Sequence, residues 1–187
     1  FGVQSSHADP VYRYYSAPKW QRRYEPISVS PSVAQAAMIG NPVSFPRVRA
    51  LAEQYRSLAG ESGFQVVQVS EQEIVEGMLE ANRHGHIACT QGGECLAGLL
   101  RAGSEGAIAP EKTAVLNATA HSLKFQSFQQ MYFQDSFPPE YDIEPKSELI
   151  NQPQQIQGGD ASPEADREAF VSEAAAEIMD KLGLSGA

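Results

Sequence analysis

The chain is poor in cysteine, in long apolar runs and in basic charge. Its 187 residues include two cysteines, Cys89 and Cys95, whose spacing fits neither a redox CxxC pair nor a zinc ribbon. So few cysteines are typical of a reduced, cytoplasmic protein, which is the localisation we predict. No apolar run approaches the ~18 residues that span a bilayer, and the first residues lack the basic and apolar regions of an export signal. We therefore expect a soluble chain with no membrane partner.

The negative charge of the chain is concentrated at one end. Residues 1–139 hold 12 acidic and 11 basic side chains, net −1, whereas residues 140–187 hold 11 acidic and 3 basic ones, net −8. A near-neutral body has no long-range field for DNA or RNA, and an acidic tail repels phosphate backbones. We therefore predict no nucleic-acid partner, a body at 1–139 and a separate acidic tail at 140–187.

The acidic tail contains a linker and a terminal helix. Residues 151–161 are polar and aperiodic, as in a linker. The helix is expected to begin with Ser162 as N-cap and Pro163 at its first position, and to end before Gly183. Its narrow apolar stripe predicts packing on the body or on a partner subunit and consists of Phe170, Val171, Ala174, Ile178 and Leu182.

Strand and helix patterns alternate through the body. Short apolar or β-branched runs predict strands, and apolar residues at helical spacing predict helices. The expected strands are 1–4, 64–69, 87–88 and 113–118. The expected helices begin at Pro10, after Ser32, at Pro46, after Ser70 and near Gly93. Such alternation predicts an α/β fold with a parallel sheet flanked by helices.

Two of these helices carry the clearest local signals. Residues 70–73, Ser-Glu-Gln-Glu, have the pattern of a capping box, in which a serine hydroxyl and a glutamate satisfy free helix amides. The apolar face that follows is expected to be buried and contains Ile74, Val75, Met78 and Leu79. Residues 46–59 predict an amphipathic core helix through Val48, Leu51, Ala52, Tyr55, Leu58 and Ala59.

The run best suited to a ligand contact is residues 113–125. Val115 and Leu116 are expected to form the buried end of a strand, and polar side chains follow at Asn117, Thr119, His121 and Ser122. Ligands of open α/β sheets bind outside the carboxyl ends of the strands. Two alternatives remain open, because Thr119 is also suited to capping the helix that begins near His121, and His121 is suited to orienting the turn rather than acting as a base.

Three further segments carry motifs in a defined order. Phe1–Gln4 is a strand, Ser32–Pro42 ends in Ile-Gly-Asn-Pro, and His86–Leu99 has a glycine-rich turn before Ala-Gly-Leu. Together with Thr-Ala-His-Ser-Leu-Lys at 119–124, these segments resemble the threonine synthases, pyridoxal-phosphate enzymes of the tryptophan-synthase-β-like family (fold type II). The resemblance covers about residues 1–135 and corresponds to the C-terminal portion of such an enzyme.

The resemblance implies a reaction, a cofactor and a set of site residues. The reaction converts O-phospho-L-homoserine and water to L-threonine and phosphate, with pyridoxal 5'-phosphate as cofactor and a small amino acid as substrate. Thr119 would hydrogen-bond the pyridine nitrogen of the cofactor, with Ala118 and Ala34 against the ring. Thr90 and Gln91 would contact the substrate. The resemblance leaves a homodimer open.

One part of the family's site is missing from this sequence. The family holds the cofactor through a lysine in an N-terminal Ser-x-Lys-Asp/Asn-type motif, and none of the chain's five lysines has that context. We therefore expect a chain whose N-terminal part is missing, which holds no Schiff-base residue and is inactive alone. The turn also departs from the family pattern, because Ala120 and Ser122 stand where the family has glycines.

Other interpretations remain open. A related pyridoxal-phosphate enzyme, such as a cysteate synthase or a serine/threonine dehydratase, would share the resemblance. A non-catalytic domain of the same fold would use the acidic terminal helix as an interaction module. The run His84-Gly-His86-x-x-Cys89 contains residue types that bind zinc, but no fourth ligand follows at a standard spacing. No metal site is predicted.

Overall fold

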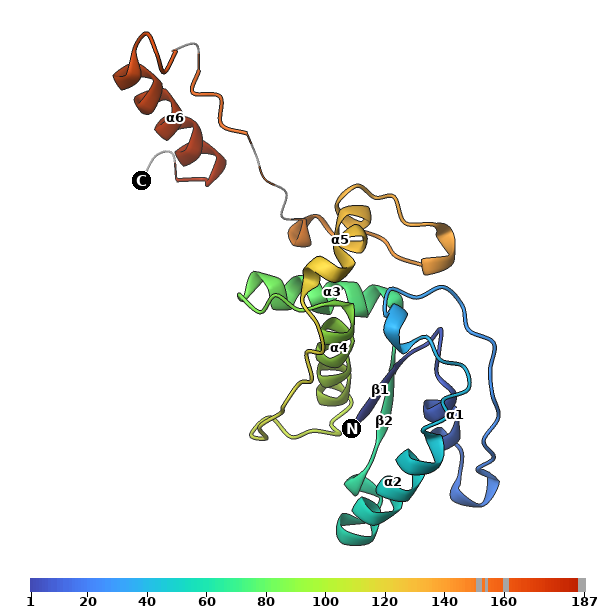
Figure 1. The fold of residues 1–187 in the computed structure, drawn as a ribbon. Helices are drawn as coiled ribbons and strands as arrows, with labels where there is room; N and C mark the ends of the chain where they lie inside the picture. Colours follow the sequence, from blue (N-terminus) through green and yellow to red (C-terminus); the bar gives the residue numbers. More distant parts are fainter. Residues whose placement is uncertain (151–152, 154, 160–161, 185–187) are drawn as a thin grey trace. The chain divides into compact units, whose positions relative to one another are not determined.

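The computed structural model describes residues 1–150, 153, 155–159 and 162–184. Two short strands and six α-helices form the regular structure of these residues, together with short 3-10 helices (Figure 1). The chain divides into two units, Phe1–Ile150 and Asn151–Ala187. The strands are β1 (Gly2–Ser5) and β2 (Val66–Val69). The α-helices are α1 (Pro10–Ser16), α2 (Phe45–Ala59), α3 (Glu71–Arg83), α4 (Thr90–Ser104), α5 (Gln126–Phe133) and α6 (Arg167–Lys181). Short 3-10 helices are η1 (Lys19–Gln21), η2 (Gln35–Ala37), η3 (Gly60–Gly63), η4 (Ser122–Phe125), η5 (Pro139–Tyr141) and η6 (Ser147–Leu149).

The two strands form a parallel pair, as the alternating pattern predicts. Gly2 pairs with Val66 and Ser5 with Val69, so both carboxyl ends meet at the same edge. The chain is therefore a mixed α/β protein with a small parallel sheet. The resemblance to fold type II stays an expectation about the larger fold.

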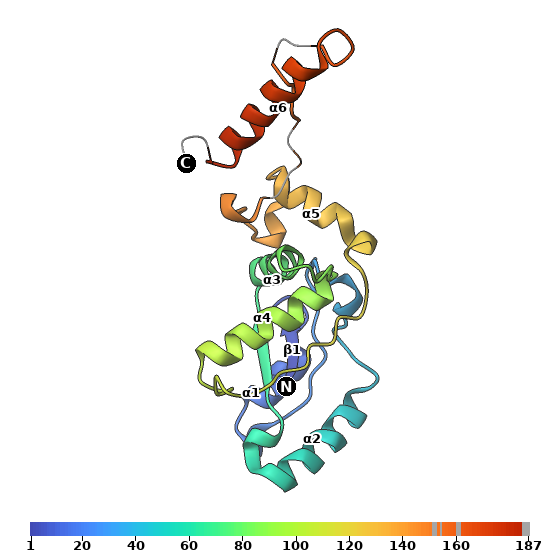
Figure 2. The same ribbon diagram turned by 90° about the vertical axis from the view of Figure 1, so that its left-hand side faces the viewer.

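Helices cover both faces of this small sheet (Figures 1 and 2). Successive side chains of a strand point to opposite faces, and β1 uses both. Val3 faces α4, because a Cβ on Gly98 of that helix would lie 2.3 Å from Val3 Cγ2. Gln4 faces α1, where its Oε1 accepts hydrogen bonds from the amides of Val11 and Tyr12, both at 2.9 Å. The side chain of Gln4 thus satisfies two free amides in the first turn of α1.

The helices α3 and α4 cross in backbone contact. A Cβ on Gly93 would lie 2.3 Å from the carbonyl oxygen of Ile74, and one on Gly77 would lie 2.6 Å from that of Gly93. The capping box that opens α3 is confirmed, with Ser70 and Glu73 bonded reciprocally. The predicted apolar face of α3 is also confirmed and forms the centre of the core, with Ile74, Val75, Met78 and Leu79 all at most 3% exposed.

The helix α2 exists as predicted, but most of its expected core face is not buried. Leu51, Tyr55 and Leu58 are 47%, 57% and 84% exposed, and only Phe45 and Ala52 are buried. Helical spacing places apolar residues on one side of a helix, but it does not show whether another element packs against that side.

The body extends to Ile150, so residues 140–150 belong to the first unit rather than to the acidic tail. The hydroxyl of Tyr132, on α5, accepts a hydrogen bond of 2.9 Å from the amide of Lys146. Leu149 is 8% exposed and belongs to the main hydrophobic cluster. These contacts hold the acidic segment against α3 and α5, which local composition could not indicate.

The second unit contains α6 and the preceding loop. The helix begins later than predicted, because Asp166, not Ser162, caps it by accepting a hydrogen bond of 3.0 Å from the amide of Ala169. Gly183 follows its end with a φ of +67°, as predicted. Glu177 Oε2 accepts hydrogen bonds from the amides of Gln157 (2.9 Å) and Gly158 (3.1 Å), which lower the pKa of Glu177. The predicted linker at 151–161 lies partly outside the described residues.

Three expected elements are missing or shortened in the described structure of the body. The strand at 113–118 is irregular, and Val115 and Leu116 are 95% and 39% exposed rather than buried. The helix after Ser32 is reduced to η2. The strand at 87–88 is a single bridge between Ala88 and His121. In the part of the chain described, no helix is long and apolar enough to cross a membrane.

The α3–α4 crossing yields a stability prediction. Replacing Gly93 with Ala should lower the free energy of unfolding by roughly 1–3 kcal/mol, because the new methyl overlaps the backbone of α3. Urea unfolding followed by circular dichroism measures this change. The control is Gly103→Ala on the same helix, where a Cβ meets nothing within 4 Å. That control should stabilise by roughly 0.5–1 kcal/mol, and equal effects at the two sites would contradict the crossing.

Candidate functional site

The first turn of α4 lies at the carboxyl end of the parallel sheet. Ser5 is the last residue of β1, and its amide donates a hydrogen bond of 3.1 Å to Glu94 Oε1 on α4. Cys89 is the N-cap of α4 but provides no side-chain cap. The amides of this first turn therefore lack a side-chain acceptor, at the edge of the sheet where α/β proteins bind ligands.

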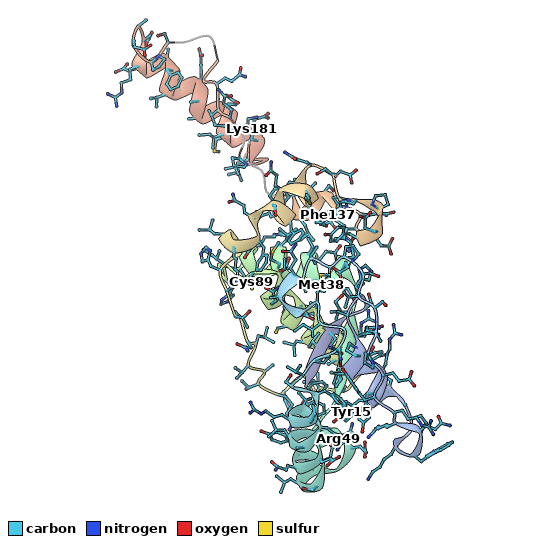
Figure 3. The ribbon with its side chains drawn as sticks, turned by 45° about the vertical axis from the view of Figure 1, so that its right-hand side comes forward. Tyr15, Met38, Arg49, Cys89, Phe137 and Lys181 are labelled. Atoms are coloured by element: carbon cyan, nitrogen blue, oxygen red, sulfur yellow. The ribbon has the colours of Figure 1, made fainter. Side chains whose placement is uncertain are left out.

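The turn at 117–121 packs against this end of α4. The Cys89 amide donates a hydrogen bond of 3.2 Å to the Ala120 carbonyl, and the Cys95 thiol donates one of 3.5 Å to the Asn117 carbonyl. The Thr119 hydroxyl lies 3.8 Å from the sulfur of Cys89. Figure 3 labels Cys89 beside α3 and α4. Residues 113–118 form no strand, and the turn after them lies against the first turn of α4.

Four of the five predicted contact residues lie together in this region. Thr90 and Gln91 are 0% and 8% exposed on the first turn of α4. Ala118 is their neighbour, because a Cβ on Gly92 would lie 3.7 Å from Ala118 Cβ. Thr119 is exposed beside them. The structure therefore gathers these residues at one place, while their contact with a ligand stays a prediction.

Ala34, the fifth predicted residue, is fully buried. It belongs to the same hydrophobic cluster as Cys89, and the adjoining η2 packs against α4. Its side chain has no exposed surface, so in this conformation it supports the site from within the core.

Two polar atoms of the site lack partners. Among the described residues, Thr90 Oγ1 and Gln91 Nε2 are buried side-chain atoms without a hydrogen bond. An unsatisfied buried polar group costs roughly 1–3 kcal/mol. Both atoms are enclosed in this conformation, as Ala34 is, so their contact with a ligand stays a prediction.

His121 organises the turn. Its Nδ1 accepts a hydrogen bond of 3.2 Å from the Leu123 amide and so caps η4. The capping role that was the alternative for Thr119 therefore belongs to His121. This leaves the Thr119 hydroxyl available to a ligand.

The two cysteines are poorly suited to act as nucleophiles. Cys89 is fully buried. Burial raises the pKa of the Cys95 thiol above its usual value, which disfavours the reactive thiolate.

A buried carboxylate pair that the sequence patterns did not predict lies next to this site. Glu71 is 2% exposed and accepts hydrogen bonds from the Ser5 hydroxyl and from the Val33 amide, the latter at 2.6 Å. Glu94 is 6% exposed. The usable signal was a glutamate among the small and apolar residues of α4, since an isolated acid on such a helix is usually buried with a partner.

The environment of Glu94 favours its neutral form. Burial, with a smaller contribution from the negative charge of Glu71, raises the pKa of Glu94 from 4.5 to about 7, and the hydrogen bond from the Ser5 amide only partly opposes this. A carboxyl that exchanges its proton near neutral pH therefore lies one turn after Thr90 on α4.

The fold and site define an α/β protein in which the first turn of α4 and the turn at 117–121 meet near the carboxyl end of a parallel strand pair. No protein-family model matches the chain. The chain is similar to Threonine synthase 2, chloroplastic, of Arabidopsis thaliana, with 28% identity over 123 residues. That match covers 66% of this chain and 22% of the relative, so the matched part spans less than a quarter of the relative's length. The similarity supports a distant relation to threonine synthases, which use pyridoxal phosphate.

The raised pKa of Glu94 gives a pH prediction. Its stabilising contribution is fully present below pH 4.5, where it is protonated in both states, and is lost as the pH rises to about 7. Glu94→Gln does not titrate and keeps an acceptor for Ser5. The variant should therefore gain stability over the native chain between these two pH values, reaching up to roughly 3 kcal/mol at pH 8.

Urea unfolding at intervals from pH 4 to pH 8 tests this prediction. Glu111→Gln, at an exposed position, is the matched control and should show no comparable trend. A difference between Glu94→Gln and the native chain that does not vary with pH would contradict the assignment of the proton to Glu94.

Proposed function

We propose that the chain forms the ring-contacting side of a pyridoxal-phosphate-dependent active site of the threonine-synthase type. The complete enzyme would convert O-phospho-L-homoserine and water to L-threonine and phosphate. The observation that carries the proposal is the position of the Thr119 hydroxyl, 3.8 Å from Cys89 at the uncapped N-terminus of α4.

The residues present fit one side of a pyridine ring. Thr119 offers a neutral hydroxyl, which can donate a hydrogen bond to an unprotonated ring nitrogen, whereas a carboxylate at the same place would keep that nitrogen protonated. Ala118 lies beside Gly92 and provides a small apolar surface. Thr90 Oγ1 and Gln91 Nε2 have no partners among the described residues, which supports a role for them in binding polar atoms of a substrate.

The cofactor and the residues of this chain have separate roles in the proposed site. When bound, pyridoxal phosphate supplies an electron sink for the amino-acid substrate. The chain's own residues would bind and orient: Thr119 at the ring nitrogen, and Thr90 and Gln91 at the substrate. The buried core beneath Ala34 would exclude water from the inner side of the site.

The first test of this proposal is replacement of Thr119 in the full-length gene product. Thr119→Ala should shift the absorbance of the bound cofactor and lower turnover by roughly five- to tenfold, as expected for a lost hydrogen bond of about 1 kcal/mol. Thr119→Ser keeps the hydroxyl and should stay near the native values. Absorbance spectra and phosphate release from O-phospho-L-homoserine provide the two measurements.

The control for these variants is Thr113→Ala, an exposed threonine in the same segment, which should change neither measurement. An unchanged spectrum and rate in Thr119→Ala would remove this residue from the site. Absence of phosphate release by the native protein, with turnover of serine instead, would favour a dehydratase-type relative.

The second test concerns the 187-residue chain alone. Lys146 and Lys181 lie 2.7 Å and 3.6 Å from glutamate carboxylates, and no lysine of the chain lies in a Schiff-base motif. We expect this chain to release no phosphate from O-phospho-L-homoserine. We also expect that pyridoxal phosphate and borohydride label no one lysine in preference to the others. Turnover by the isolated chain would contradict the proposed division of the site.

A further inference from the structure

A basic pocket lies between α1, η1, α2 and η3. It has a volume of about 550 Å³. Figure 3 labels Tyr15 and Arg49 in this region. Four basic side chains and two acidic ones line it, namely Lys19, Arg22, Arg49, Arg56, Glu53 and Glu61. The surrounding segment is basic as well, since residues 10–60 hold 7 basic and 2 acidic side chains, net +5, in a chain of net charge −9.

Tyr15 provides a donor at the wall of this pocket. Its hydroxyl is buried and has no hydrogen-bond partner in the part of the chain described. Burial, and then the neighbouring Tyr14, raise the pKa of Tyr15, so the hydroxyl keeps its proton. The guanidinium carbons of Arg56 and Arg22 lie 4.8 Å and 5.3 Å from the centre of its ring.

The two arginines are held in place by backbone carbonyls. Arg56 donates to the Phe64 carbonyl through Nε (3.0 Å) and Nη2 (2.9 Å), and Arg22 donates from Nε to the Ala17 carbonyl at 3.1 Å. Their side chains are only 14% and 13% exposed. Fixed, half-desolvated guanidinium groups are better suited to anion recognition than mobile surface cations.

One exposed carboxylate is shared by these two cations. Glu61 Oε2 lies 2.8 Å from Arg56 Nη1 and 3.7 Å from Arg22 Nη2, and the Glu61 side chain is 68% exposed on η3. An exposed ion pair of this kind contributes little stability, about 0–1 kcal/mol. Glu61 therefore occupies the place of an anion while remaining easy to displace.

We propose that this pocket binds a small phosphate monoester. The phosphate oxygens take the place of Glu61 between Arg22 and Arg56, and the Tyr15 hydroxyl donates to the ligand. Lys19 and Arg49 add positive charge at the pocket wall. A phosphate group would fill only part of a cavity of about 550 Å³, so the organic part of the ester lies against the remaining wall. This site does not involve Thr119 or α4 and is independent of the function proposed above.

Inorganic phosphate titrated into the 187-residue chain is the probe, with potassium chloride used to hold the ionic strength constant. Isothermal titration calorimetry should detect saturable binding. Tyr15→Phe removes one hydrogen bond to a charged ligand and should weaken binding about tenfold. Glu61→Gln removes the competing carboxylate and should tighten binding several-fold.

A matched pair of variants on α2 distinguishes binding at this pocket from a general effect of positive charge. Arg49→Gln, at the pocket wall, should weaken phosphate binding, whereas Arg47→Gln, exposed on the same helix and outside the pocket, should not. Both variants remove one positive charge. Circular dichroism checks that each variant folds, and the Arg49 and Glu61 variants keep the test decisive if Tyr15→Phe does not fold.

Three outcomes would overturn the proposal. They are the absence of saturable phosphate binding, equal weakening by Arg47→Gln and Arg49→Gln, and unchanged or weaker binding in Glu61→Gln. None of them bears on the cofactor site, because its variants are at Thr119 and are measured by cofactor absorbance and turnover.

Discussion

The backbone contact between α3 and α4 is the constraint on which the rest of the structure depends. Gly77 and Gly93 let the two helices cross with no side chain between them. This crossing brings the first turn of α4 to the carboxyl end of the strand pair, where the Ser5 amide reaches Glu94 at 3.1 Å. The position of Thr90 and of the turn that carries Thr119 follows from the same crossing.

The polar groups around this crossing differ in how well they are satisfied. Glu71 is buried but accepts hydrogen bonds from the Val33 amide and the Ser5 hydroxyl, which is how a protein retains a buried carboxylate. Thr90 Oγ1 and Gln91 Nε2, in contrast, have no partners within the described residues. Structural polar groups are usually paired, so these two atoms are groups at the start of α4 that the described part of the fold does not satisfy.

Local sequence was sufficient where local interactions decide the structure. The capping box at Ser70 and Glu73 depends on residues three apart, and it was predictable.

The strand expected around Val115 and Leu116 does not form, because a strand needs a neighbouring strand with which to pair. This segment borders a cavity of about 620 Å³ whose opposite wall includes Val3 of β1, so no ladder forms there. The helix expected after Ser32 is replaced by contacts with a distant segment, including a hydrogen bond of 2.6 Å from the Val33 amide to Glu71 Oε2 at the start of α3. Glu94 was missed for the same reason, since its partner Ser5 lies 89 positions away in the sequence.

A crystal structure of the full-length protein with pyridoxal phosphate tests the central claim most directly. We predict that the Thr119 hydroxyl oxygen lies about 2.7–3.0 Å from the pyridine nitrogen, with Thr90 and Gln91 facing the substrate side of the ring. A cofactor bound with its ring nitrogen against a carboxylate, or bound away from the first turn of α4, would contradict it.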